Sequence, residues 1–292
     1  MTDRPTDQPP RQRWQILFAR RDPALRVRQA ELLGEFERAF REAGLPLSQT
    51  NAIRPRPRLK FAANLPVGVG SCPGVRPGGE VQTEQGLCTL NFLFVTPEGE
   101  RFIGTAGHCI VGEGPVADNA GEKTWAKGTG PAAKDSGNTR IGEFAYAVLQ
   151  DPKDFALIRV DPGVDASPEM CNYGGPTGIN DEISDGPKVL QYFGNGVGIG
   201  STVPARSAVA MGFPNADHVY AAGLALPGDS GSAVITDDGR AVGVLVTTGL
   251  HGLGFDENGV DFGTMGITRI TPQIARASQA LGLQLTMVTA GK

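Results

Sequence analysis

Apolar residues recur along most of the chain in short runs, which are separated by turns rich in glycine, proline, aspartate and asparagine. From about residue 78 these runs are rich in β-branched and aromatic residues, a pattern that predicts buried strands. The predicted strands are 88–96, 102–106, 144–149, 155–160, 188–193, 203–211, 219–224, 232–235, 241–247 and 263–268. About a dozen short strands with turns between them predict one β-barrel or sandwich assembly.

The end of the chain changes to a helical pattern. A helix is predicted over 271–281, with Thr271 as its N-cap, Pro272 at its first position and Gly282 at its end. Residues 283–288 then return to an extended pattern.

The N-terminal part predicts a small α+β unit. Its predicted elements are a strand at 14–19, a helix at 22–43 that ends at Gly44, and a strand at 58–63. Residues 1–12 are polar and rich in proline, and they predict no regular structure. We therefore expect an arginine-rich segment and linker at 1–77 and a β domain at 78–292.

Composition and charge support this division. The 41 glycines and 22 prolines among 292 residues indicate many turns, which fits an all-β body. Residues 1–60 hold 13 Lys and Arg against 7 Asp and Glu, whereas the remainder holds 14 against 24, so a net charge of −4 divides into +6 and −10. The asymmetry indicates two parts with different histories or partners. No run of about 18 apolar residues predicts a transmembrane helix.

The four cysteines are Cys72, Cys88, Cys109 and Cys171. None forms a C-x-x-C pair and no Cys/His group has zinc-finger spacing, so no structural metal is predicted. An even count in a turn-rich domain favours two disulfides and an oxidising compartment. An observation against an oxidising compartment is that residues 1–13 show no signal peptide, because no apolar region precedes a small-residue cleavage site.

One glycine-rich turn is a candidate for chemistry. The stretch 226–234, Leu-Pro-Gly-Asp-Ser-Gly-Ser-Ala-Val, places Ser230 on a tight turn before an apolar run. A serine there can present its hydroxyl to a cleft, while adjacent backbone N–H groups hold the negative charge of a carbonyl under attack. Taken alone, such a turn is more often an ordinary hairpin turn.

A base and an acid are available elsewhere in the chain. His108 ends an apolar strand within Thr-Ala-Gly-His-Cys, where small neighbours leave its ring open, whereas His218 and His251 lie in polar or glycine-rich loops. Asp154 begins a buried strand, where an acid must cap a turn or bond to a partner because burying it unpaired is costly. Taken singly, each of these residues is more often structural than catalytic.

Together, the segments 105–109, 154–158 and 228–231 occur in the order His, Asp, Ser, the order of the chymotrypsin group. Over residues 80–290 the chain resembles trypsin-like serine peptidases, most of all the secreted bacterial branch that includes streptogrisins and α-lytic protease. The stretch 266–273, Gly-Ile-Thr-Arg-Ile-Thr-Pro-Gln, is similar to their C-terminus. The resemblance implies a mostly β, chymotrypsin-like fold of two six-stranded antiparallel β-barrels and a C-terminal helix.

The resemblance also implies residue roles. Ser230 would be the nucleophile that forms an acyl-enzyme, and His108 would be the general base. Asp154 would fix the histidine tautomer and stabilise the imidazolium. Backbone N–H groups of Gly228 and Ser230 would form the oxyanion hole.

The surroundings of the serine turn follow the family with departures. In the family, the residue equivalent to Asp229 holds the oxyanion loop through an ion pair, often with an internal arginine in bacterial members, and Arg206 is the candidate here. Ser232 stands where the usual motif has a second glycine, and a small residue fits there. No cysteine lies just upstream of Gly228, so the family's disulfide near the specificity pocket is missing.

By its offset from the serine motif in the family, Leu224 lies near the base of the specificity pocket. The wall strand adds Val246, Thr247 and Thr248 as substrate-binding candidates. None of these residues is acidic, which argues against a preference for Lys or Arg. An apolar or small P1 residue is expected.

The resemblance implies one disulfide. Cys88 and Cys109 flank a two-strand hairpin much as in the first disulfide of those enzymes. Cys72 and Cys171 remain, and by elimination we pair them with each other. That bond would tie the N-terminal linker to the connection between the barrels.

The arginine-rich segment has a resemblance of its own. The stretches 36–47, 54–61 and 65–69 are similar to the opening of an uncharacterised bacterial family whose members are encoded with, or fused to, radical-SAM proteins. The match covers about residues 11–71, and no cysteine cluster for an iron–sulfur site accompanies it, so no radical chemistry is inferred. A packing or pro-region module is favoured over an RNA-binding one, because a basic surface alone is weak evidence.

The sequence therefore predicts a monomeric serine endopeptidase that acts on protein or peptide substrates without a cofactor or metal. Paired cysteines and the resemblance predict a secreted or extracytoplasmic location, and neither a membrane nor a nucleic-acid partner is expected. The alternative is a peptidase-like binding module without turnover, with a nucleic-acid-binding N-terminal segment as a further alternative.

Overall fold

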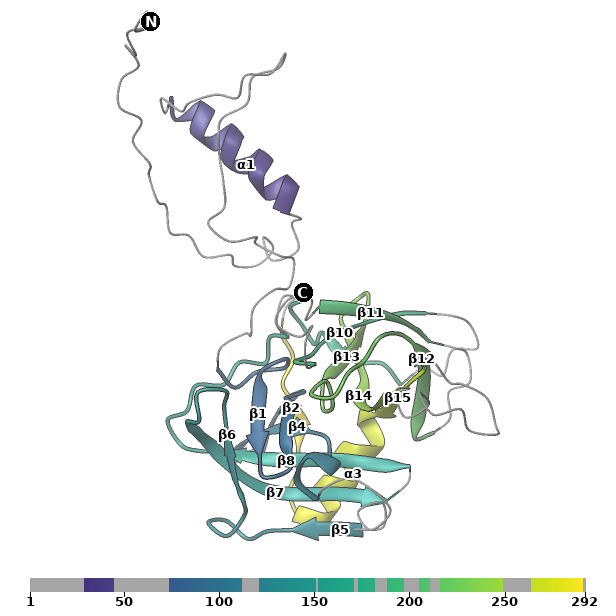
Figure 1. Cartoon of the computed structure of the whole chain (residues 1–292). Helices are drawn as coiled ribbons and strands as arrows, with labels where there is room; N and C mark the ends of the chain where they lie inside the picture. Colours follow the sequence, from purple (N-terminus) through teal and green to yellow (C-terminus); the bar gives the residue numbers. More distant parts are fainter. Residues whose placement is uncertain are drawn as a thin grey trace, which may run out of the picture.

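The structure is a computed structural model that describes residues 29–44, 74–111, 121–150, 152–170, 173–181, 188–196, 205–210, 216–248 and 264–290. Within these residues the chain forms two sheets, antiparallel except for one short pairing in the second, and three helices (Figure 1). The helices are α1 (Gln29–Glu42), α2 (His108–Val111) and α3 (Ile270–Leu281). Helix α3 contacts strands of both sheets and so joins them.

The first sheet contains nine described strands in the order β16-β3-β4-β8-β7-β6-β1-β2, with β5 paired to β7. It curves into a half-barrel. Its strands are β1 (Glu80–Thr83), β2 (Gly86–Thr89), β3 (Leu93–Val95), β4 (Arg101–Thr105), β5 (Gly121–Thr124), β6 (Ala132–Lys134), β7 (Arg140–Gln150), β8 (Lys153–Val160) and β16 (Thr286–Met287).

The second sheet closes on itself, because β13 pairs with β14 as well as with β10. The ring β13-β10-β11-β12-β15-β14 is a six-stranded barrel, and β9 adds a short parallel pairing to β14. Its strands are β9 (Gly178–Ile179), β10 (Val189–Phe193), β11 (Ala205–Ala210), β12 (His218–Ala222), β13 (Ala233–Thr236), β14 (Arg240–Thr248) and β15 (Thr264–Arg269).

The predicted fold class is confirmed: the chain is mostly β, with two barrel-like sheets and a C-terminal helix. Only the second sheet forms the closed six-stranded barrel that was expected of both. The predicted strand 88–96 is divided at Leu90–Phe92, and β1, β5, β6 and β9 were not predicted. The predicted strands 14–19 and 58–63 lie outside the described residues, and the domain boundary at 77/78 stays a prediction.

The N-cap prediction for the last helix was wrong. Helix α3 begins at Ile270, and Arg269 in extended conformation takes the N-cap position without a side-chain cap bond. Thr271 lies in the first turn, and its hydroxyl bonds to the Asp181 carboxylate. Gly282 ends the helix in the left-handed conformation, as predicted.

Aromatic and branched aliphatic side chains form the buried core of both sheets. The largest fully buried side chains are Tyr146, Tyr192, Phe92, Phe94, Phe102, Phe144, Phe155, Phe193, Leu90, Ile103, Leu157 and Ile158. None of the helices in the described ranges is long and apolar enough to span a membrane.

The Phe94→Ala variant should lose about 3–5 kcal/mol of unfolding free energy, because it removes a buried ring from the core. The Phe94 ring packs edge-on against Phe155, with 6.2 Å between ring centroids. Urea unfolding followed by circular dichroism measures the loss. Val209→Ala is the control, because Val209 is 44% exposed and such surface changes cost under about 0.5 kcal/mol. Equal losses in both variants would contradict the assignment of this core.

Candidate active site

The candidate histidine and aspartate come from adjacent strands of the first sheet. Strand β4 ends at Thr105, which pairs with Ala156 of β8. His108 opens helix α2 three residues after β4, and Asp154 is the second residue of β8. The pairing of β4 with β8 therefore brings the two side chains to the same edge.

A short network fixes His108 against Asp154. The imidazole Nδ1 lies 2.7 Å from Asp154 Oδ2, and Asp154 Oδ1 accepts hydrogen bonds from the backbone N–H groups of Gly107 (2.5 Å) and His108 (3.0 Å). Since a carboxylate accepts, the proton on the ring is assigned to Nδ1, which leaves Nε2 as the basic nitrogen.

Gly107 is required by this packing. A Cβ atom at this position would lie 2.0 Å from the carbonyl oxygen of Val148 and 3.0 Å from Asp154 Oδ1. Any side chain at this position would therefore push the histidine turn away from the acid that holds it.

The Ser230 turn reaches the same place from the second sheet. The carbonyl of Ser230 accepts from the N–H of Thr89 at 2.8 Å. Gly231 has φ 92°, and a Cβ atom on it would lie 2.4 Å from Thr105 Oγ1. The turn thus rests on the end of β4, three residues before His108, so all three predicted triad residues gather at the junction of the two sheets.

Two backbone N–H groups in the turn are available as donors. Across the described part of the chain, no acceptor is hydrogen-bonded to the N–H of Gly228 or of Ser230. Gly228 has φ 98°, and a Cβ atom on it would lie 2.7 Å from the carbonyl oxygen of Asn195, so only glycine fits there.

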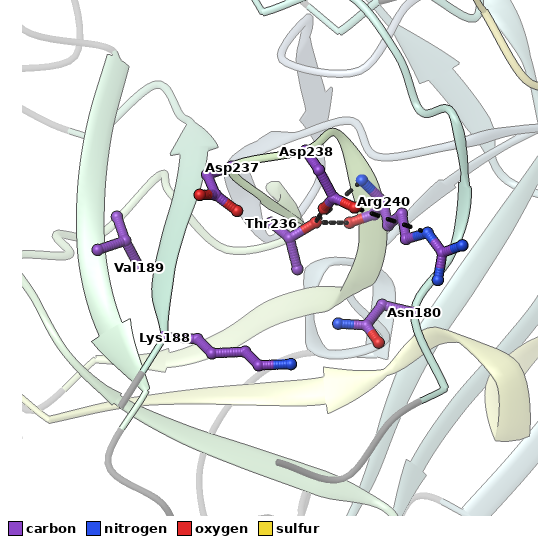
Figure 2. A pocket seen from close by; sticks show the side chains of 7 residues that line it. All are labelled: Asn180, Lys188, Val189, Thr236, Asp237, Asp238 and Arg240. Atoms are coloured by element: carbon purple, nitrogen blue, oxygen red, sulfur yellow. Dashed lines mark hydrogen bonds and ion pairs between the residues drawn. The ribbon is translucent and has the colours of Figure 1, made fainter. Parts of the chain in front are cut away.

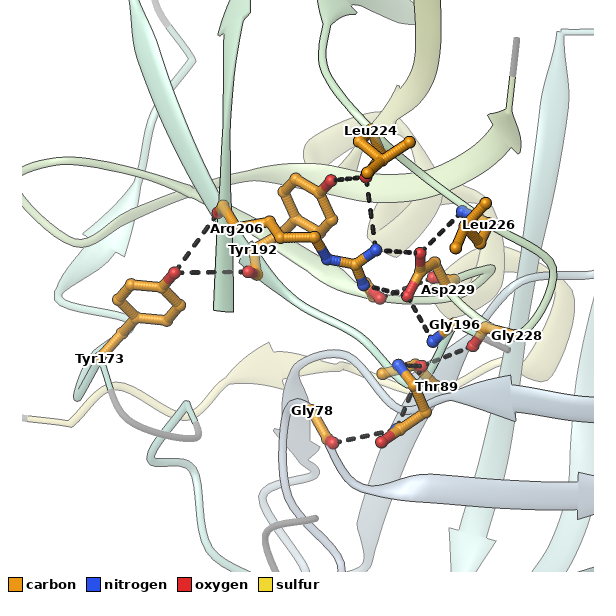
Figure 3. A network of polar contacts seen from close by, with 12 residues as sticks. Gly78, Thr89, Tyr173, Tyr192, Gly196, Arg206, Leu224, Leu226, Gly228 and Asp229 are labelled. Atoms are coloured by element: carbon orange, nitrogen blue, oxygen red, sulfur yellow. Dashed lines mark hydrogen bonds and ion pairs between the residues drawn. The ribbon is translucent and has the colours of Figure 1, made fainter. Parts of the chain in front are cut away.

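Asp229 is fully buried and fully paired (Figure 3). Arg206 donates from both terminal nitrogens, with Nη1 2.6 Å from Asp229 Oδ2 and Nη2 bonded to Oδ1. The backbone N–H groups of Gly196 (2.7 Å) and Leu226 (2.8 Å) also donate to the carboxylate. The arginine suggested by the resemblance is therefore the partner of Asp229.

The Arg206 side chain also contacts the Tyr192 ring and the backbone of Leu224. Its guanidinium lies 5.0 Å from the centre of the Tyr192 ring, and its Nη1 donates to the Leu224 carbonyl at 3.3 Å. The Tyr192 hydroxyl donates to the same carbonyl. Burial raises the pKa of Tyr192, and that of Tyr173 to about 12, so both hydroxyls keep their protons at neutral pH.

The predicted substrate-binding residues differ in exposure. Leu224 is 55% exposed, whereas Val246 is buried in β14. Thr247 and Thr248 lie in β14 and pair with Gly266 and Met265, and their side chains lie outside the described part of the structure.

The disulfide that the resemblance implied between Cys88 and Cys109 is present. These sulfur atoms and a nitrogen of His108 lie within 4.8 Å of one another, but bonded sulfurs are not thiolates and cannot ligate a metal as thiolates do. Cys72 and Cys171 lie outside the described residues, so their pairing stays a prediction.

A separate cavity of about 450 Å³ lies at the far end of β13 from Ser230. Figure 2 shows its lining of Asn180, Lys188, Val189, Thr236, Asp237, Asp238 and Arg240. The Thr236 hydroxyl donates to the Asp238 carboxylate, which also lies 3.7 Å from Arg240. The carboxylate and the guanidinium in the lining therefore form an ion pair with each other.

A half-barrel and a closed six-stranded barrel, joined by a C-terminal helix, decide the architecture. The fold is chymotrypsin-like. Solved structures with this fold are similar to the chain over most of its length. A protease described as glutamic acid specific, with a histidine triad in substrate binding, is 18% identical, covers 73% of this chain and 100% of its own, and gives a TM-score of 0.49.

Nocardiopsis protease is 20% identical, with 72% of this chain and 98% of its own covered and a TM-score of 0.48. Cellulomonas bogoriensis chymotrypsin is 21% identical, with 73% and 99% covered and a TM-score of 0.46. Residues 13–75 match a family described as an uncharacterized protein conserved in bacteria (DUF2344). No curated protein matches the chain.

Several residues of the candidate site were not predicted from the sequence. Thr89, Tyr192 and Gly196 contact the serine turn or its ion pair, and Asn195 donates to Thr89. The one available signal was the position of Thr89, which directly follows the disulfide cysteine Cys88.

Replacing Arg206 by Met is expected to lower the unfolding free energy by about 3–5 kcal/mol, because it leaves the buried Asp229 carboxylate without its countercharge. The double variant Arg206→Met/Asp229→Asn should recover part of this loss, since it removes the orphaned charge. The control Arg140→Met breaks a half-exposed pair with Asp161 and should cost under about 1 kcal/mol. Chemical denaturation measures all three, and equal effects of Arg206→Met and Arg140→Met would refute a buried pair.

Proposed function

We propose that the chain is a serine endopeptidase that hydrolyses peptide bonds through an acyl-enzyme. The observation that carries the proposal is the His108 imidazole, held at 2.7 Å by Asp154 near a serine turn in which the N–H groups of Gly228 and Ser230 have no hydrogen-bond acceptor among the described residues. Nucleophile, base, orienting acid and oxyanion donors are the parts that acyl transfer needs.

The proposed reaction proceeds in two halves. Ser230 Oγ attacks the carbonyl carbon of the substrate while His108 Nε2 takes its proton, and the N–H groups of Gly228 and Ser230 stabilise the oxyanion. The carbon–nitrogen bond then breaks, and His108 returns the proton to the leaving amine. Water attacks the acyl-enzyme with His108 again as base, which releases the carboxylic acid and restores Ser230.

An apolar or small P1 residue is proposed as the preferred substrate. Leu224 presents an exposed aliphatic side chain beside the turn, and the buried Val246 lies in the proposed wall strand. Neither they nor Thr247 and Thr248 carry a negative charge that would attract Lys or Arg. Cleavage of a peptide library tests this preference, and preferential cleavage after Lys or Arg would contradict it.

A fluorophosphonate probe tests the proposed nucleophile. The folded protein should be labelled at Ser230, and labelling and peptide hydrolysis should both disappear in Ser230→Ala. The test uses the full chain and, in parallel, protein from which any N-terminal segment has been removed. A folded protein that is not labelled in either form would refute the enzyme and leave a peptidase-like binding module.

The role of residues 1–77 is a separate proposal. We propose a packing or pro-region module, and salt-dependent RNA binding by the segment is the result that would favour a nucleic-acid role instead.

An extracytoplasmic location is proposed for the barrels. The Cys88–Cys109 disulfide supports it, because such bonds persist in oxidising compartments.

The Asp154→Asn variant is expected to keep its fold and its KM but to lose about 10⁴ in kcat, because the amide favours the wrong histidine tautomer. Asp161→Asn is the matched control, since Asp161 follows the other end of β8 and pairs with Arg140 on the surface. Steady-state kinetics on a peptide amide measures both. Near-wild-type turnover of Asp154→Asn would show that another acid orients His108.

A further inference from the structure

Two buried hydroxyl groups hold consecutive carbonyls of the serine turn. Thr89 Oγ1 donates to the carbonyl of Gly228 at 2.8 Å, and Ser232 Oγ donates to the carbonyl of Asp229 at 2.6 Å. Both side chains are completely buried. Thr89 ends β2 of the first sheet, whereas Ser232 directly precedes β13 of the second, so the turn is held from both sides of the junction.

The direction of the Thr89 proton follows from its partners. A hydroxyl has one donor and two acceptor positions. The backbone N–H of Asn195 (3.1 Å) and its Nδ2 (3.2 Å) both donate to Thr89 Oγ1, and Nδ2 is identified as the amide nitrogen because it also donates to the carbonyl of Gly78 (3.2 Å). The hydroxyl proton is therefore directed at Gly228 (Figure 3).

The bond from Thr89 fixes one peptide plane at both ends. The Gly228–Asp229 peptide accepts from Thr89 at its oxygen and donates to the carbonyl of Leu226 at its N–H, at 2.9 Å. A trans peptide is rigid, so this plane cannot rotate without breaking one of the two bonds. Gly228, which carries one of the proposed oxyanion donors, is thereby held on its C-terminal side.

Ser232 fixes the next plane. The carbonyl of Asp229 accepts from both the N–H (3.0 Å) and the hydroxyl (2.6 Å) of Ser232. In a trans peptide the N–H points opposite to the carbonyl, so the N–H of Ser230 is turned away from Ser232. Gly194 makes room for this hydroxyl, since a Cβ atom there would lie 2.6 Å from it.

We propose that Thr89 and Ser232 are positioning residues for the oxyanion hole, and this inference rests on the proposed function. They aim the N–H groups of Gly228 and Ser230 without touching the substrate. Loss of either hydroxyl should lower kcat about 10-fold, less than the 10²–10³ expected when an oxyanion donor itself is removed. KM should stay unchanged, because the oxyanion forms only in the transition state.

Full-length Thr89→Val and Ser232→Ala remove one hydroxyl each, and Thr89→Ser keeps it. Thr96→Val is the matched control, because Thr96 is a buried threonine whose hydroxyl accepts from Glu100 in a turn of the first sheet. We expect about 10-fold lower kcat at constant KM in the first two variants, wild-type kcat in Thr89→Ser and Thr96→Val, and binding of a peptide boronate weakened in parallel with kcat.

The outcomes separate the two proposals. A wild-type protein that neither hydrolyses peptides nor reacts with the fluorophosphonate overturns the peptidase and the positioning roles together. An active wild type with unchanged kcat in both hydroxyl variants overturns the positioning roles alone, as does a loss that appears only in KM. Thermal denaturation checks each fold, and if Thr89→Val does not fold, Ser232→Ala decides.

Discussion

The geometry of the site depends on the buried carboxylate of Asp229. A charge removed from water in this way is tolerated only when it is paired and hydrogen-bonded. Its donors come from Arg206 in β11, from Gly196 after β10 and from Leu226 before the turn. One charge therefore forces three separate parts of the second barrel to meet beneath the serine, and Arg206 extends the same constraint to the Leu224 carbonyl.

The fold was predictable where strands are apolar and continuous. Strands β7 and β8 are long and almost wholly buried, and their runs of aliphatic and aromatic residues predict them directly. Strand β5, Gly-Glu-Lys-Thr, is largely exposed at an edge and has no apolar alternation. Its extended conformation therefore depends on its pairing with β7. The closure of the second barrel also needs the long-range pairings of β10 with β13 and of β12 with β15, which no local pattern encodes.

The residues of the candidate site were likewise predictable only in part. His108, Asp154 and Ser230 each lie in a distinctive local sequence, and their order along the chain suggested a common role. Thr89 is hydrogen-bonded to Gly228, which lies 139 residues further along the chain, and to Asn195, which lies 106 residues further along. A threonine at a strand end has no sequence pattern that would predict these bonds. Only the folded chain shows that the residue after a disulfide cysteine reaches the opposite barrel.

The partners of Asp229 have a consequence for how such a chain can be assembled. Its countercharge and its backbone donors are all built into the body of the second barrel, so no free α-amino group is needed beneath the serine. The amino end of the barrels contributes instead through the Gly78 carbonyl, which accepts a hydrogen bond from Asn195 Nδ2. The ion pair beneath the serine turn therefore does not depend on whether a segment such as 13–75 is joined upstream or cut away.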